Sequence, residues 1–224
     1  MSLKPPKHSE MKWPDKRESK KRKISLDYNL IVTEGTKTEP QYFELLKENI
    51  NRNEKNRIQL EIIGSGKNTR GLFEYARSLV LKSPNGYSHV WLVYDMDDFP
   101  VDRFNVTATL CENYGTKDGV TYHAIWSNEC IELWFLLHFS YMQSNLHRFE
   151  YFPKLTEYLA GFGEYKKNRD DLFDILLPHL DTAIENAEKL SLEHEGCTPA
   201  ESAPGTMMFE MMQKFRPYLI IPSP

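Results

Sequence analysis

The sequence of 224 residues has few cysteines and no long apolar run. Its three cysteines, Cys111, Cys130 and Cys197, are odd in number and far apart, so they provide neither a disulfide framework nor a C-x-x-C metal pair. No window approaches about 18 uninterrupted apolar residues, and the amino-terminal stretch is too charged for a signal peptide. We therefore expect a soluble, cytoplasmic protein of a reducing compartment, with no membrane segment.

Several catalytic motifs are also absent. The chain has no G-x-S-x-G elbow, no H-E-x-x-H pair and no Cys/His signature with a usable local context. The segment GSGKNTR at residues 64–70 resembles a phosphate-binding loop, but Glu61 replaces its leading glycine and Asn68 its Ser/Thr. This excludes a P-loop NTPase. Lys67 and Arg70 remain candidates for a phosphate contact, and the alternative is a flexible turn.

The charge is unevenly distributed along the chain, which otherwise has enough apolar residues (40%) for a substantial core. Residues 1–26 carry nine Lys/Arg against three acids, a net charge of +6. The remaining residues carry 19 Lys/Arg against 29 acids, a net charge of -10. We expect residues 1–26 to form a flexible basic arm, which either contacts phosphates or only keeps the chain in solution.

After the arm, short apolar runs alternate with amphipathic stretches. The pattern predicts strands at residues 28–33, 58–63, 90–94 and 121–126, and helices at 38–50, 69–81 and 104–113. Thr38 and Gln41 have the spacing of a capping box at the start of the first helix. Because the apolar runs are mostly hydrophobic on both faces, we predict an α/β, Rossmann-like fold with a mainly parallel sheet covered by helices.

The second part of the chain has only helical patterns. We expect helices at residues 129–139, 151–161, 170–193 and 206–218, the third being kinked or broken at Pro178. The predicted organisation is thus an arm (1–26), an α/β core (27–140) and a helical C-terminal extension packed on it (141–224).

Acidic residues follow two of the predicted strands. The strand at 90–94 leads into Asp95, Asp97 and Asp98, and a strand that continued through them would point Asp95 and Asp97 to one side. Glu34 follows the first strand, and the carboxyl ends of parallel strands meet at one edge of a sheet. We therefore predict that Glu34, Asp95 and Asp97 hold Mg²⁺ or Mn²⁺, with Asp98 outside this set. An acidic, solvated turn is the alternative.

The residues after Glu34 favour a phosphate ligand at the same edge. Gly35 allows a tight turn, and the start of the next helix offers backbone N–H groups to a phosphate. Lys37, in this turn, is a further candidate for substrate binding.

The end of the fourth strand supplies more candidates. Ser127 and Asn128 either bind substrate at this edge or cap the next helix. Glu132 is a possible fourth catalytic acid or a buried ion-pair partner, and Glu129 shares its helix face. His138 is predicted to be a structural histidine.

A second basic cluster and an apolar group lie further along the chain. Lys166, Lys167 and Arg169 could hold a nucleic-acid backbone from a helical region, although such clusters are often solvated surface. Trp134, Phe135 and Leu137 are predicted core residues rather than a platform for stacking bases.

Three segments resemble the RloB-like family, whose core is similar to the Toprim catalytic domain of topoisomerases, primases and OLD-type nucleases. The segments are VTEGTKTEPQYF at 32–43, Asp95-Met96-Asp97, and SNECIELWFLLHF at 127–139, with a weaker match at Pro204-Gly205-Thr206. By this resemblance Glu34 corresponds to the Toprim glutamate, a metal ligand or general acid/base, and Asp95 and Asp97 to the metal-binding aspartates. The sequence departs from the family pattern at Glu129 and Ile131. The resemblance therefore assigns no role to Glu129, and it leaves the candidate role of Glu132 unchanged.

The resemblance implies a metal-dependent nuclease that hydrolyses DNA or RNA beside an AAA/ABC-type ATPase, in bacterial defence against phage or foreign DNA. Two alternatives remain open. The same acids could serve a nucleotidyl or other phosphoryl transferase, or the chain could be a non-catalytic subunit that senses or recruits.

Overall fold

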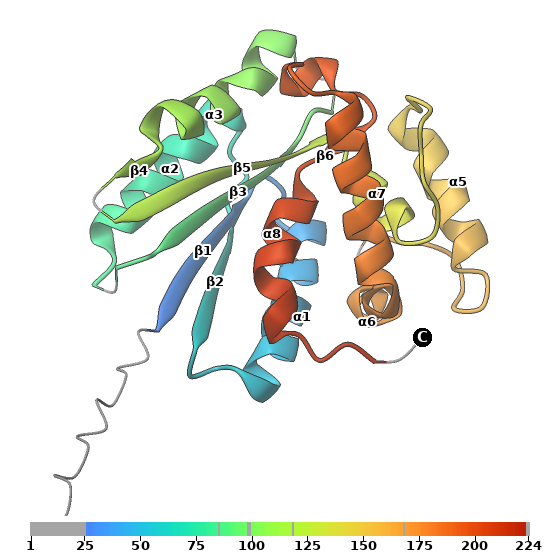
Figure 1. The fold of residues 1–224 in the computed structure, drawn as a ribbon, viewed down its shortest axis with the longest axis horizontal. Helices are drawn as coiled ribbons and strands as arrows, with labels where there is room; N and C mark the ends of the chain where they lie inside the picture. Colours follow the sequence, from blue (N-terminus) through green and yellow to red (C-terminus); the bar gives the residue numbers. More distant parts are fainter. Residues whose placement is uncertain (1–25, 85, 98–99, 118, 168, 223–224) are drawn as a thin grey trace, which may run out of the picture.

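The structure is a computed structural model that describes residues 26–84, 86–97, 100–117, 119–167 and 169–222. Almost all of the predicted basic arm lies outside these residues, and so does Asp98. A sheet runs through the middle of the molecule with helices on both faces (Figure 1). Within the described ranges, no helix has the length and apolar character needed to cross a membrane.

Four parallel strands form the centre of the sheet, as the sequence predicted. They are β1 (Asp27–Thr33), β2 (Ile58–Gly64), β3 (His89–Asp95) and β5 (Val120–Asn128). Two short strands pair antiparallel with β5, namely β4 (Thr116–Lys117) and β6 (Gly205–Thr206). The strand order is β2-β1-β3-β5-β4, so all four parallel strands end at one edge.

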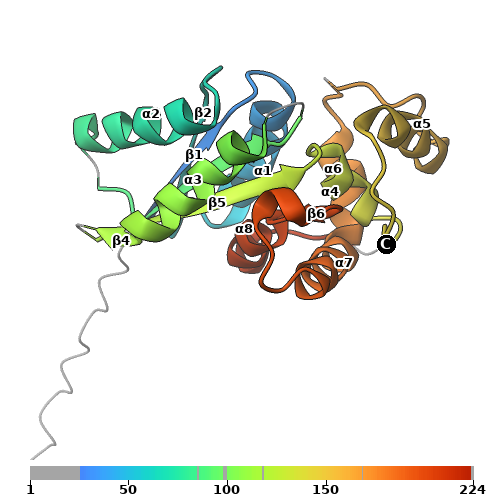
Figure 2. The same ribbon diagram turned by 90° about the horizontal axis from the view of Figure 1, so that it is seen from above.

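Side chains of each strand alternate between two cores. Leu30 and Val32 of β1 pack under α2 (Thr69–Lys82) and α3 (Val101–Tyr114), on one face of the sheet. Ile31, between them, points to the opposite face, against α1 (Thr38–Asn53) and α8 (Met208–Phe215). Figure 2 shows these two pairs of helices on opposite sides of the sheet. This alternation explains why the strands are apolar on both faces.

The remaining helices pack beside α1 and α8 and contribute to the same core. They are α4 (Glu132–Leu137), α5 (Arg148–Tyr158), α6 (Leu172–Leu176) and α7 (Leu180–Glu193), with short 3₁₀ turns at Leu177–His179, Pro199–Glu201 and Arg216–Tyr218. Pro178 lies in the 3₁₀ turn between α6 and α7 and separates them, as predicted. Trp134, Phe135 and Leu137 are fully buried, which confirms them as core.

Some predicted boundaries were wrong. The capping box does not form, because Thr38 is already the first helical residue and Lys37, without a side-chain hydrogen bond, is the N-cap. The helix predicted from residue 129 begins only at Glu132, since β5 continues to Asn128. The last helix begins at Met208, because Thr206 belongs to β6. With two residues each, β4 and β6 are too short to give a sequence pattern.

The core around α4 should dominate stability. We expect Leu136→Ala to lower the free energy of unfolding by about 2–5 kcal/mol, because Leu136 is fully buried and its removal leaves a cavity. Leu81→Ala on α2 is the matched control, since Leu81 is 81% exposed and should change stability by less than about 0.5 kcal/mol. Urea unfolding measures both, and equal effects of the two substitutions would contradict this assignment of the core.

Candidate metal centre

Glu34 and Asp95 lie at the carboxyl edge of the sheet, on neighbouring strands. Glu34 directly follows β1, and its backbone N–H donates to the Val93 carbonyl oxygen of β3 at 2.8 Å. Asp95 is the last residue of β3 and pairs in register with Ser127 of β5. The parallel pairing of β1 with β3 therefore brings together two acids that are far apart in the sequence.

Asp97 reaches this edge by a turn and not by the strand pleat that the sequence suggested. β3 ends at Asp95, and Asp97 has a positive φ of 44°, a left-handed conformation that Asp tolerates better than most residues. Its backbone N–H donates to the Glu129 carbonyl oxygen at 3.0 Å, which fixes the turn against the end of β5. The carboxylate of Asp97 forms an ion pair with Arg148, the first residue of α5.

Glu39 is a fourth acid of this edge that the sequence analysis did not select. It lies in the first turn of α1 and is almost fully buried. The Glu39 carboxyl group lies close to Gly35, so a Cβ at residue 35 would collide with it unless the Glu39 side chain moved. A close approach is therefore a second reason for glycine here, beside the predicted tight turn. A glutamate four residues after the glycine that follows the strand was the available signal.

Glu132 is the fifth acid and the most deeply buried, with 1% of its surface exposed. It is the first residue of α4. The Tyr165 hydroxyl donates to its Oε1 at 3.0 Å, and the Lys167 ammonium lies 3.7 Å from the same oxygen. Glu132 is therefore both an acid of the edge and a buried ion-pair partner.

The five carboxyl groups act on one another electrostatically. Burial, and then Asp97 and Glu39, raises the pKa of Glu34 to about 7. Burial, and then Glu39, Glu132 and Asp97, holds the pKa of Asp95 well above its usual range. The pKa of Glu39 is also raised, by burial first and by Glu132 and Asp97 after it, while Lys167 opposes the shift. A positive charge bound at this edge would therefore stabilise the ionised form of these carboxyl groups.

The donor chemistry of this edge fits a divalent cation. Glu34 Oε2 and Asp95 Oδ1 are buried and have no hydrogen-bond partner, although buried carboxylate oxygens normally have one. Within the ranges that the structure describes, no three His, Cys, Asp or Glu side chains stand together as a preformed metal site. Mg²⁺ usually takes one or two carboxylates and keeps several waters or substrate oxygens, so it needs no such cage.

Three of the predicted substrate-binding residues are exposed near this edge. Lys37 precedes α1, and Lys67 and Arg70 follow β2. The loop that carries Lys67 is fastened to the end of β1, since the Ser65 and Gly66 N–H groups donate to the Thr33 and Glu34 carbonyl oxygens at 2.9 and 3.0 Å. The fold therefore leaves these basic side chains accessible beside the acids.

Ser127 and Asn128 have structural roles in place of the predicted substrate contact or helix cap. Both are buried. The Ser127 hydroxyl is 2.9 Å from the Thr206 hydroxyl, and the Asn128 amide donates to the Pro199 and Ala200 carbonyl oxygens at 3.1 and 3.3 Å. These bonds join the end of β5 to the C-terminal part of the chain.

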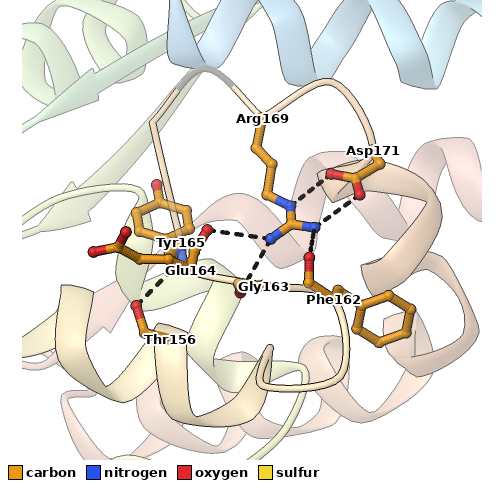
Figure 3. Close-up of polar contacts among 7 residues, drawn as sticks. All are labelled: Thr156, Phe162, Gly163, Glu164, Tyr165, Arg169 and Asp171. Atoms are coloured by element: carbon orange, nitrogen blue, oxygen red, sulfur yellow. Dashed lines mark hydrogen bonds and ion pairs between the residues drawn. The ribbon is translucent and has the colours of Figure 1, made fainter.

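The basic cluster of Lys166, Lys167 and Arg169 lies in a loop and not in a helix. Arg169 does not face solvent for a nucleic-acid backbone: its guanidinium binds Asp171 with two hydrogen bonds of 2.6 and 2.8 Å (Figure 3). It also donates to the carbonyl oxygens of Phe162, Gly163 and Glu164. These hydrogen bonds close the loop from which the Tyr165 and Lys167 side chains contact Glu132. Lys166 is exposed and remains a candidate for the backbone contact, whereas the Lys167 ammonium forms an ion pair with Glu132.

His138 and Glu129 make structural contacts. His138 is buried, its Nδ1 lies 2.9 Å from the Trp134 carbonyl oxygen, and burial lowers its pKa to about 3. It is therefore a neutral, structural histidine. Glu129 lies outside α4, and its Oε2 accepts the backbone N–H of Arg148 at 2.9 Å.

A comparison with protein-family models gives one match, to the model described as RloB-like protein, over residues 29–215. This span covers most of the chain and contains all five acids. No curated protein and no solved structure matches the chain significantly.

The raised pKa of Glu34 predicts a pH-dependent stability without metal. Folding raises this pKa from 4.5 to about 7, so the stability that the protonated group contributes is complete below pH 4.5 and lost as the pH rises through about 7. Between about pH 5 and pH 8, wild type should lose about 1–2 kcal/mol of unfolding free energy relative to Glu34→Gln, after allowance for partial solvent exposure. Urea unfolding in a chelator measures this, and a pH-independent difference would contradict it.

The Arg169 loop predicts a contrast between two arginines that both bind an aspartate. Arg169→Gln should lower the unfolding free energy by about 1–2 kcal/mol, because the Arg169 side chain, which is only 11% exposed, loses hydrogen bonds to three carbonyl oxygens of the loop and an ion pair with the half-exposed Asp171. Arg216→Gln is the control, since its pair with Asp181 is exposed and worth about 0–1 kcal/mol. Equal losses in thermal or urea unfolding would show that the loop does not depend on Arg169.

Proposed function

The chain belongs to the RloB-like family, and we propose that it is a metal-dependent nuclease that hydrolyses phosphodiester bonds in DNA or RNA. The observation that carries this proposal is the meeting of Glu34, Asp95 and Asp97 at one edge of the sheet, with buried carboxylate oxygens that lack a partner. A buried, unpaired carboxylate is costly, and a site that retains several of them is best explained by a cation that binds there.

Glu34, Asp95 and Asp97 are the proposed ligands of Mg²⁺ or Mn²⁺. When bound, such an ion would activate water and neutralise the charge that develops on the phosphodiester. The resemblance gives Glu34 the alternative role of a general acid or base, and without a bound ion its pKa is raised to about 7. We propose that Glu132 supports the site as a fourth acid, with its charge balanced by Lys167.

The exposed basic residues are the proposed contacts to the nucleic-acid backbone. Lys37, Lys67, Arg70 and Lys166 are accessible, and basic side chains gain affinity from phosphates without sequence preference. The nine Lys/Arg of residues 1–26 would add to this attraction and offset the negative charge of the remaining chain.

The family resemblance supports two broader parts of the proposal. By the resemblance, the acids would form a Toprim-like catalytic core, and the biological role would be defence against phage or foreign DNA beside an AAA/ABC-type ATPase. Both parts rest on the resemblance.

The proposed nuclease activity can be tested with Glu34→Gln and Asp97→Asn. With labelled single- and double-stranded DNA and RNA in Mg²⁺ or Mn²⁺, each substitution should reduce cleavage by about 10²- to 10⁴-fold, because a metal ligand or proton-transfer group is lost. Asp181→Asn is the matched control, since Asp181 also pairs with an arginine, at an exposed site.

Two outcomes would contradict the nuclease. Incorporation of labelled nucleotide without strand cleavage would favour a nucleotidyl transferase on the same acids. Absence of metal binding by wild type, together with unchanged defence activity of the Glu34→Gln, Asp97→Asn double variant, would favour a non-catalytic subunit.

A further inference from the structure

Arg148 reaches the acidic edge from the helical part of the chain, 51 residues after Asp97. It is the first residue of α5, and its guanidinium forms an ion pair with the Asp97 carboxylate. Its backbone is held at the same edge, because the Arg148 N–H donates to Glu129 Oε2 at 2.9 Å. Glu129 Oε2 also lies 3.9 Å from His147 Nε2. The backbone is thus anchored, while the side chain is long enough to take another position.

A divalent cation and Arg148 compete for Asp97. Both are positive, and two positive charges a few ångströms apart in a partly buried site repel each other strongly. A cation that binds Asp97 would therefore weaken the ion pair. The guanidinium would remain close to the acids, because its backbone is anchored through Glu129.

A phosphate is the best new partner for this guanidinium. The planar fork of arginine matches two phosphate oxygens, and a nucleic-acid strand that reaches the metal brings phosphates to the same place. Five carboxyl groups make this edge repulsive to a polyanion, and Arg148 and Lys167 are the basic side chains that form ion pairs with them among the described residues. Lys167 pairs with Glu132, which is 1% exposed, whereas the Asp97 carboxylate that Arg148 binds is 43% exposed and accessible to a cation.

Phe149 gives this segment a second contact to nucleic acid. Its side chain is 68% exposed, which is unusual for a phenylalanine. Its ring lies against the His147 ring, with centroids 4.8 Å apart, and the Arg148 guanidinium is 5.7 Å from the ring centroid. An exposed aromatic ring beside a phosphate-binding cation is typical of proteins that bind single strands, whose bases are free to stack.

We propose that Arg148 exchanges Asp97 for a substrate phosphate when the acidic edge binds a divalent cation, and that Phe149 stacks on a neighbouring unpaired base. The inference rests on the proposed nuclease function and assigns its substrate as a single-stranded or unwound nucleic acid. Arg148 is then a substrate-binding residue, and its pairing with Asp97 describes the state before metal and substrate bind.

The exchange predicts opposite effects of one substitution on two ligands. Arg148→Gln should tighten Mn²⁺ binding by about 5-fold, measured by calorimetry without nucleic acid, because the competitor for Asp97 is removed. The same variant should weaken binding of a fluorescein-labelled oligothymidylate by about 10-fold in Ca²⁺, measured by anisotropy, and lower the salt dependence by about one phosphate contact. A residue with only a structural role would weaken both.

Three further variants make the test specific. Phe149→Ala should weaken binding of the single strand by about 10-fold, with Mn²⁺ affinity unchanged and binding of the annealed duplex little affected. Arg148→Lys should keep the salt dependence of wild type, because it keeps the charge. Arg57→Gln is the matched control, since Arg57 also forms an ion pair with a carboxylate, that of Glu54, but precedes β2 at the opposite edge of the sheet, and it should change neither affinity.

The outcomes separate this inference from the nuclease proposal. Weaker or unchanged Mn²⁺ binding by Arg148→Gln, or an unchanged oligonucleotide affinity, would overturn the exchange even if wild type cleaves nucleic acid. Equal losses of single strand and duplex with Phe149→Ala would overturn the stacking. If wild type neither binds Mn²⁺ nor cleaves, the proposed function fails and the exchange fails with it.

Discussion

Carboxyl groups repel one another strongly when burial removes the water that would screen them, and this repulsion governs the edge of the sheet where β1 and β3 end. Glu34, Glu39, Asp95, Asp97 and Glu132 meet there, and burial first, with repulsion from the other acids added to it, raises the pKa values of Glu34, Glu39 and Asp95. A cation bound at this edge would offset the repulsion, which is the basis of the proposed metal site.

The helical part of the chain supplies what offsets this repulsion in the folded protein. Arg148 pairs with Asp97, while Tyr165 and Lys167 contact Glu132 from a loop that Arg169 closes. The same helices share one apolar core with α1 and one face of the sheet. The predicted core and extension consequently depend on each other for packing and for charge balance, although the sequence separates them by composition.

The parts of the fold that the sequence predicted are those with a repeated local pattern. The four parallel strands are short, continuous apolar runs and most helices have an apolar period of 3.6 residues, and each was found within a few residues of its predicted position. The predictions that were wrong concern features that depend on one particular contact in the folded protein. Thr38 forms no capping box, Ser127 and Asn128 bind the C-terminal segment, and Arg169 binds backbone carbonyls of its own loop. Contacts of this kind depend on the folded position of a distant or irregular segment, which no local pattern records.

The candidate site likewise combines features that the sequence predicted with features that only the structure revealed. The order of strand ends in the sequence was enough to bring Glu34 to the edge of Asp95 and Asp97, because parallel strands joined by helices must end together. Only the tertiary structure added Glu39 through its close approach to Gly35, replaced the strand pleat by a left-handed turn at Asp97, and placed Arg148 against that carboxylate. The physical reason is range: hydrophobic periodicity acts between near neighbours and is written in the sequence, whereas electrostatic pairing and close packing act between residues that only folding brings together.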